Sequence, residues 1–67
     1  MTHRQLTRKL IRLGFQFYRR AAGSHEIWWH PQTRRRTTVP NHGSKDIPKG
    51  TLAKILRDLD LHIEEIA

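Results

Sequence analysis

The chain has no cysteine among its 67 residues, so neither a disulfide framework nor a thiolate metal site can support it. Its longest unbroken apolar run is Ile27-Trp28-Trp29, far below the ~20 residues that a membrane span needs. No apolar stretch follows the N-terminal charges, which argues against a signal peptide. We therefore expect one small cytoplasmic domain over residues 1–67, without a membrane partner.

Acidic residues are scarce, with 6 Asp and Glu against 13 Lys and Arg, for a net charge of +7. Residues 1–57 contain every basic residue and only Glu26 and Asp46, a net +11, whereas residues 58–67 carry −4 and read as a separate acidic segment. A body this basic attracts polyanions, of which nucleic acid is the commonest. A purely solubilising charge and an anionic membrane surface are the weaker interpretations.

Residues 2–13 predict an amphipathic helix. Thr2 and Gln5 have the spacing of a capping box, and Gly14 supplies the left-handed stop. The apolar stripe consists of Leu6, Leu10 and Leu13, with Arg4, Arg8 and Arg12 on another face. A transit peptide or a membrane-surface helix would have similar composition. We prefer a core-packing helix, because without it too little apolar surface would remain to fold.

From Phe15 the apolar period changes from 3.6 to 2, which predicts strands over residues 15–22, 25–30 and 35–39. The turn Gly23-Ser24 separates the first two, and Pro40 ends the third. Pro48 suits the first turn of a second helix, and residues 61–66 predict one more short turn. The expected fold class is therefore α+β, with a helix, a three-stranded antiparallel sheet and a second helix. The apolar stripe of the second helix is Leu52, Ile55, Leu56 and Leu59.

Adjacent Trp28 and Trp29 on a strand must point to opposite faces of the sheet. If both helices cover one face, one tryptophan is in the core and the other is a candidate platform for stacking a nucleobase. Alternation along this strand alone favours Ile27 and Trp29 as the buried set.

The run Arg34-Arg35-Arg36 is either a charged hairpin end or a phosphate-binding cluster, and Lys45 and Lys49 predict a second cationic patch at the start of the second helix. The Gly43-Ser44-Lys45 segment lacks the earlier glycine of a Walker A loop, so we expect no nucleotide cofactor.

Histidine is the residue type best suited to chemistry here. The spacing of His25, His30 and His42 is a weak metal signal, since no thiolate or carboxylate ligand accompanies these residues. His25 follows a tight turn at a strand start, where a rigidly held imidazole could transfer protons near neutral pH. RNA supplies its own nucleophile in the 2′-hydroxyl, so such a residue could support strand cleavage.

Five segments together resemble the HicA (YcfA-like) toxins of bacterial toxin–antitoxin pairs, over nearly the whole chain. They are Gly23-Ser24-His25, Val39-Pro40-Asn41-His42-Gly43, Asp46-Ile47, Gly50-Thr51-Leu52 and Ile55-Leu56. The resemblance implies a fold similar to the double-stranded-RNA-binding domain. It also implies a ribonuclease (mRNA interferase) that cleaves mRNA without a metal or other cofactor, and a HicB-type antitoxin that holds it inactive.

The same resemblance assigns roles to residues. The family's catalytic histidine falls on His25, and His42 is expected to have a structural or phosphate-contact role. The family pattern also favours Trp28 in the core, with His25, Ile27 and Trp29 on the other face, and we adopt this parity.

Two departures from the family pattern stand out. Many members have a second histidine where this chain has Glu26, so a carboxylate there would act on the His25 imidazole instead. The segment 17–23 is also about one residue longer than usual, which leaves the register of the first strand open.

The leading hypothesis is a toxin ribonuclease, monomeric when free, with RNA and an antitoxin as partners. His25 is its general acid or base. A non-catalytic double-stranded-RNA-binding module is the alternative, and a DNA-binding or ribosome-associated basic protein is the third interpretation. The expected substrate-binding residues are Gly23, Ser24, Trp29, Arg34, Arg35, Arg36, His42, Lys45 and Lys49.

Overall fold

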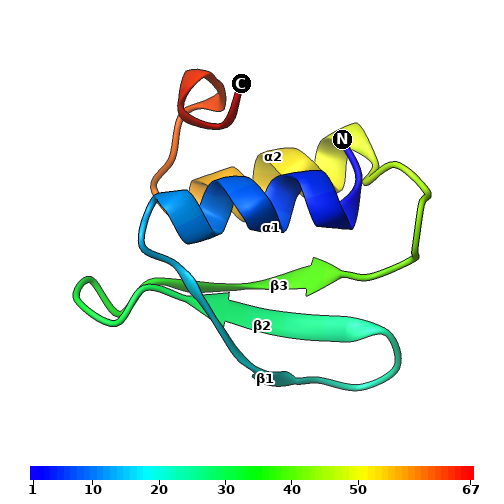
Figure 1. Ribbon diagram of the computed structural model, residues 1–67, viewed down its shortest axis with the longest axis horizontal. Coiled ribbons are helices and arrows are strands. Elements are labelled where there is room, and N and C mark those ends of the chain that lie inside the picture. The colour runs from blue at the N-terminus through cyan, green and yellow to red at the C-terminus, as the bar shows by residue number, and fades with distance from the viewer.

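The structure, a computed structural model, describes residues 1–67. The order of elements is α1 (His3–Arg12), β1 (Gln16–Arg20), β2 (His25–Trp29), β3 (Arg36–Pro40), α2 (Lys49–Asp58) and a 3₁₀ turn, η1 (Ile63–Ile66). The strands form an antiparallel meander in the order β1-β2-β3, and both helices lie on one side of the sheet (Figure 1). The α+β class and the order of elements predicted from the sequence are confirmed.

α1 begins and ends at the residues that its sequence signals indicate. The Thr2 hydroxyl accepts a hydrogen bond from the Gln5 backbone N–H at 3.2 Å, while the Gln5 side chain accepts from the Thr2 N–H at 2.9 Å. Gly14 follows the helix with a φ of 94°. A Cβ at this position would lie 2.7 Å from Nε2 of the His30 ring, so a larger residue would require this ring to move.

Several helix and strand boundaries differ by one or two residues from those that the sequence predicts. The first two strands end at Arg20 and Trp29, and Pro40 is the last residue of β3 rather than the residue beyond it. Pro48 caps α2 from outside, since the helix itself begins at Lys49. None of the helices has the length and apolar character that crossing a membrane requires.

β1 contains a β-bulge in the segment whose register the sequence left open. Phe17 lies opposite Trp28 and Arg19 lies opposite Ile27, so the register shifts between them at Tyr18. A bulge places two residues of one strand against one of its neighbour and bends the strand locally. Tyr18 is the residue of β1 that the bulge leaves without a directly paired partner on β2.

β2 is the central strand, and its side chains alternate between the two faces. Glu26 and Trp28 are each 7% exposed and lie under the helices, whereas Ile27 and Trp29 are only half-buried on the other face. The burial of Ile27 and Trp29 expected from alternation is therefore wrong, and the parity adopted from the family pattern is confirmed. The helices cover the face that carries Trp28, whose ring meets Phe17 edge-on at a centroid distance of 6.0 Å.

The acidic segment 58–67 packs against the basic residues 1–57 and is not a separate segment. Ile66 is fully buried in the core, and Nζ of Lys9 donates to the backbone oxygen of Ala67 at 3.0 Å. Asp58 accepts from Thr37 and pairs with Lys54, both at 2.9 Å. Packing of η1 against α1 thus brings these residues back onto the domain.

Leu10 tests the contribution of the α1 stripe, because it is fully buried whereas the adjacent Ile11 is 59% exposed. Leu10→Ala should lower the free energy of unfolding by about 2–5 kcal/mol through lost burial and a residual cavity, and can abolish the cooperative transition of so small a chain. Ile11→Ala should change it by less than about 1 kcal/mol. Urea unfolding followed by far-UV circular dichroism measures both. Equal losses in the two variants would contradict the burial described above.

Candidate nucleic-acid interface

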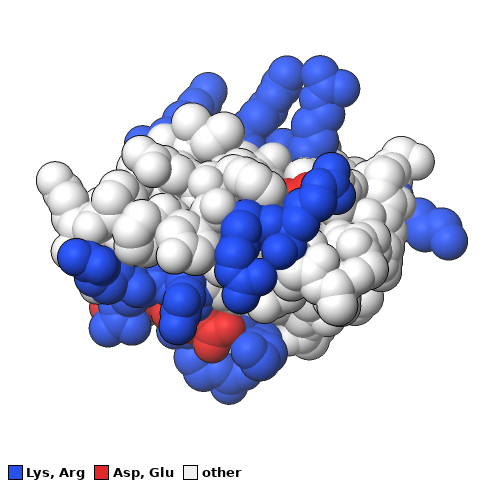
Figure 2. Space-filling model, turned by 90° about the horizontal axis from the view of Figure 1, so that it is seen from below, with Lys and Arg blue, Asp and Glu red and all other residues white.

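The face of the sheet turned away from the helices is the candidate interface, and we call it the open face. β2 contributes His25, Ile27 and Trp29. Across β3, Pro40 lies opposite His25 and Arg36 lies opposite Trp29, and directly paired residues share a face. Seen from the sheet side, Lys and Arg side chains lie at the edges of this face and across its middle, between uncharged areas, and acidic atoms occupy only small areas (Figure 2).

His25 lies at one end of the open face, where the β1–β2 turn meets the end of β3. Gly23 adopts a φ of 65° in this turn, and the His25 N–H donates to Ala22 O at 3.3 Å. The carbonyl of Ser24 accepts from the backbone N–H of Asn41 at 2.9 Å. On the other side of the residue, the carbonyl of His25 accepts from the backbone N–H of Ala21 at 2.9 Å, so the peptide groups before and after the exposed imidazole are both hydrogen-bonded.

His25 differs from the other histidines in its surroundings. The ring of His3 is bonded to Glu26, and the ring of His30 accepts from Gln32 N and packs edge-on against Phe15. His42 and His62 are exposed outside the sheet. His25 alone is an exposed histidine on the open face. No group of three or more His, Cys, Asp or Glu residues lies together in a way that could hold a metal ion.

The other end of the open face holds an aromatic and cationic cluster, which we call the Trp29 cluster. The rings of Tyr18 and Trp29 lie 4.8 Å apart between centroids, tilted by 53°. The Arg34 guanidinium carbon lies 5.8 Å from the centroid of the Trp29 ring, within cation–π range. Together with Arg36, these residues line an open hollow of about 300 Å³.

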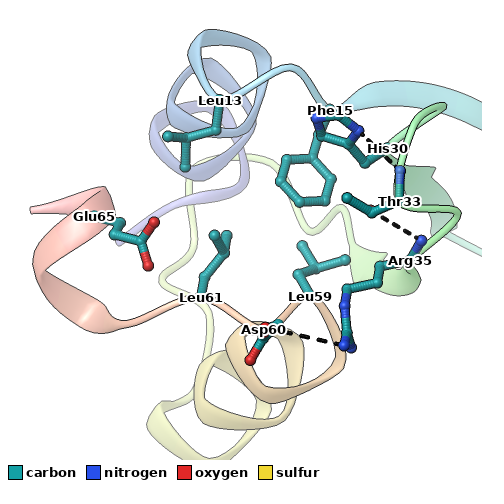
Figure 3. A pocket seen from close by; sticks show the side chains of 9 residues that line it. All are labelled: Leu13, Phe15, His30, Thr33, Arg35, Leu59, Asp60, Leu61 and Glu65. Atoms are coloured by element: carbon teal, nitrogen blue, oxygen red, sulfur yellow. Dashed lines mark hydrogen bonds and ion pairs between the residues drawn. The ribbon is translucent and has the colours of Figure 1, made fainter.

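The arginine run is divided between two sites. Arg34 and Arg36 join the Trp29 cluster, but Arg35 turns to the opposite side and reaches toward Asp60, with 3.9 Å between Nη2 and Oδ2. There it borders a hollow between the hairpin and the ends of α1 and α2 (Figure 3). Arg34 has a φ of 66°, so the turn that separates the three side chains holds a non-glycine residue in the left-handed region.

The remaining expected site residues follow β3. His42 and Lys45 are exposed in the loop that leaves Pro40, the residue opposite His25. Lys49 is the first residue of α2. None of the three lines the hollow of the Trp29 cluster.

Glu26 lies on the face opposite His25 and joins three segments. Its Oε1 accepts from Nε2 of His3 at 2.7 Å and from Nε1 of Trp28 at 3.0 Å, and its Oε2 accepts from Nδ2 of Asn41 at 3.0 Å. The expectation that Glu26 acts on the His25 imidazole is therefore wrong, because neighbours on a strand point to opposite faces. Instead it links α1, β2 and the start of the loop that leaves β3.

The electrostatics of Glu26 follow from the same contacts. Burial alone acts to raise its pKa, but hydrogen bonds from Trp28, His3 and Asn41, with the charge interaction of His3, outweigh burial and hold the pKa below the ordinary value of 4.5. The ionised carboxylate thus stabilises the folded state.

Two features of this region were not identified from the sequence. The sequence predicts a strand at Tyr18 but no role for it, whereas the structure shows a bulge at this residue and places its ring against that of Trp29. The partnership of His3 with Glu26 joins residues 23 positions apart and has no local sequence signal.

The fold and the open face define a small α+β protein with a basic, histidine-bearing sheet surface. A family model described as the HicA toxin of bacterial toxin–antitoxin systems matches residues 3–61. The chain therefore belongs to the HicA toxin family, and this membership implies an antitoxin partner. No curated protein and no solved structure matched the chain.

Acid titration tests the Glu26 link. Because its folded pKa is lowered, the stabilisation is present above its unfolded value and is lost as the pH falls through the folded value. Glu26→Gln should lower stability at about pH 6 by about 1–3 kcal/mol, and stability should then fall less between about pH 6 and about pH 3 than in the wild type. Thermal unfolding across this range, with exposed Glu64→Gln as control, measures the difference. An unchanged pH dependence in Glu26→Gln would contradict the proposed link.

Proposed function

We propose that this protein is a metal-independent endoribonuclease that cleaves mRNA, with His25 as its general acid or base. The observation that carries the proposal is the position of His25, exposed on the open face beside backbone that is hydrogen-bonded on both sides. Family membership supports a toxin role, and the basic surface supports a polyanionic substrate.

The chemistry needs the protein to accept or to donate one proton. As general base, neutral His25 accepts the proton of the 2′-hydroxyl as this oxygen forms a bond to the adjacent phosphorus. The bond from phosphorus to the 5′ oxygen breaks, and that oxygen takes a proton from solvent. The products are a 2′,3′-cyclic phosphate and a free 5′-hydroxyl. As general acid, protonated His25 would instead supply the proton to the leaving 5′ oxygen, and solvent would take the proton of the 2′-hydroxyl. Histidine suits either role near neutral pH.

Cations around His25 would hold the RNA backbone. β3 ends opposite His25, so the loop that carries His42 and Lys45 leaves the sheet at this end. We assign these residues, with Lys49 at the positive end of the α2 dipole, to phosphate contact. Gly23 and Ser24 shape the turn that admits the scissile phosphate beside the imidazole.

A HicB-type antitoxin would neutralise the toxin by covering the open face with acidic groups. The +11 charge of residues 1–57 favours such a partner, and binding to the folded toxin would stabilise it by mass action. The free toxin would be a monomer that acts on mRNA in the cytoplasm.

His25→Ala tests the assignment directly. With EDTA present, wild-type protein should cleave a single-stranded RNA, and the variant should be slower by about 10²–10⁴-fold. His62→Ala, which removes an exposed histidine whose backbone N–H makes its hydrogen bond to Glu65, should cleave at the wild-type rate. A denaturing gel and product-end analysis for the cyclic phosphate measure both.

Three outcomes oppose the proposal in different ways. Wild-type-like cleavage by His25→Ala would remove His25 from the mechanism. Loss of wild-type cleavage in EDTA would indicate a metal-dependent reaction. Tight binding of duplex RNA without cleavage would favour the non-catalytic double-stranded-RNA-binding alternative.

A further inference from the structure

We infer that the Trp29 cluster is a subsite for one unpaired nucleobase, and that it restricts the protein to single-stranded RNA. This inference rests on the proposed ribonuclease function and identifies the substrate class of the same face. The hollow is bounded by two aromatic rings, of Tyr18 and Trp29, and by two guanidinium groups, of Arg34 and Arg36. Aromatic faces and guanidinium planes are the surfaces on which proteins stack splayed-out bases.

The two rings are available to solvent. Tyr18 is 46% exposed and Trp29 is half-buried, although aromatic rings of this size are normally covered in a protein core. Trp28, the adjacent tryptophan, occupies the core, so Trp29 is not needed there. An exposed aromatic pair beside cations indicates a ligand with both a flat π surface and negative charge, as a nucleotide has.

Local backbone irregularities assemble the cluster. The bulge at Tyr18 lies in β1, and the left-handed φ of 66° at Arg34 lies in the hairpin between β2 and β3. A left-handed conformation at a residue with a side chain carries a strain that glycine would avoid. The hairpin keeps an arginine at this position, and its guanidinium lies over the Trp29 ring.

The spacing along β2 relates the subsite to the scissile bond. Trp29 lies four residues from His25 on the same face, about 13 Å at about 3.3 Å per residue. Arg36 lies opposite Trp29, and Arg19 lies opposite Ile27 midway between the two ends. A single strand that runs along β2 can therefore present a phosphate to His25 and a more distant base to Trp29, with cations between them. A duplex cannot do this without unpairing that base.

Fluorescence titration of the full chain with a single-stranded 2′-O-methyl oligoribonucleotide, which lacks the nucleophilic hydroxyl, tests the inference. Binding should quench the tryptophan fluorescence, to which Trp28 and Trp29 both contribute, and the same oligonucleotide in a duplex should bind at least about 10-fold more weakly. Trp29→Leu, measured by anisotropy of a labelled oligonucleotide, should bind the single strand about 10-fold more weakly, whereas Trp29→Phe should retain most of the affinity.

Arg34→Gly should fold, because glycine adopts the positive φ of this position without strain. Its thermal stability should equal or exceed that of the wild type, while its affinity for the single strand falls. Arg8→Gln removes one positive charge from α1 and controls for net charge, so it should reduce affinity less than Arg34→Gly does.

Failure of the subsite and failure of the ribonuclease function give different results. If His25→Ala abolishes cleavage but Trp29→Leu binds the single strand as the wild type does, the subsite is wrong and the function stands. If Trp29→Leu weakens binding of the single strand but the wild-type protein cleaves no RNA, the subsite stands and the ribonuclease function is wrong. Equal affinity of the wild type for single strand and duplex would overturn the inference.

Discussion

Alternation of side chains along β2 is the constraint on which both the core and the candidate site depend. Adjacent strand residues face opposite sides of a sheet, and both helices lie on one side. Glu26 and Trp28 are therefore directed into the structure, while His25 and Trp29 are directed out of it. Glu26 and Trp28 anchor the central strand in the core, while His25 and Trp29 are left on the open face. Any shift of its register by one residue would bury the candidate catalytic histidine and expose the core tryptophan.

Glu26 connects the two faces of this arrangement. Its carboxylate holds α1 through His3 and the loop after β3 through Asn41, and the backbone N–H of Asn41 bonds to Ser24, next to His25. A buried carboxylate with three donors is stable only while ionised and fully hydrogen-bonded. Glu26 thus has a structural role, on the side of the sheet away from His25.

Much of the fold could be predicted from local signals. The capping box at Thr2, the stop at Gly14 and the change from helical to strand periodicity at Phe15 all act within a few residues, and the structure confirms them. Alternation along β2 predicted the wrong face for the core, because Ile27 and Trp29 are the more apolar pair, whereas the buried pair is Trp28 and Glu26, whose carboxylate is hydrogen-bonded by His3, Trp28 and Asn41. Which face becomes the core depends on where the helices pack. The division of the arginine run at Arg34 depends likewise on the backbone of one turn.

The central claim is that RNA binds along the open face, from His25 to the Trp29 cluster. The most direct measurement is a two-dimensional NMR titration of the isotope-labelled chain with a non-cleavable single-stranded oligoribonucleotide. We predict that the largest shifts occur at the His25 imidazole, the Trp29 indole N–H and the backbone of β3, and that α1 around Arg8 shifts little. Shifts concentrated on α1 and the start of α2, with His25 and Trp29 unchanged, would contradict this account.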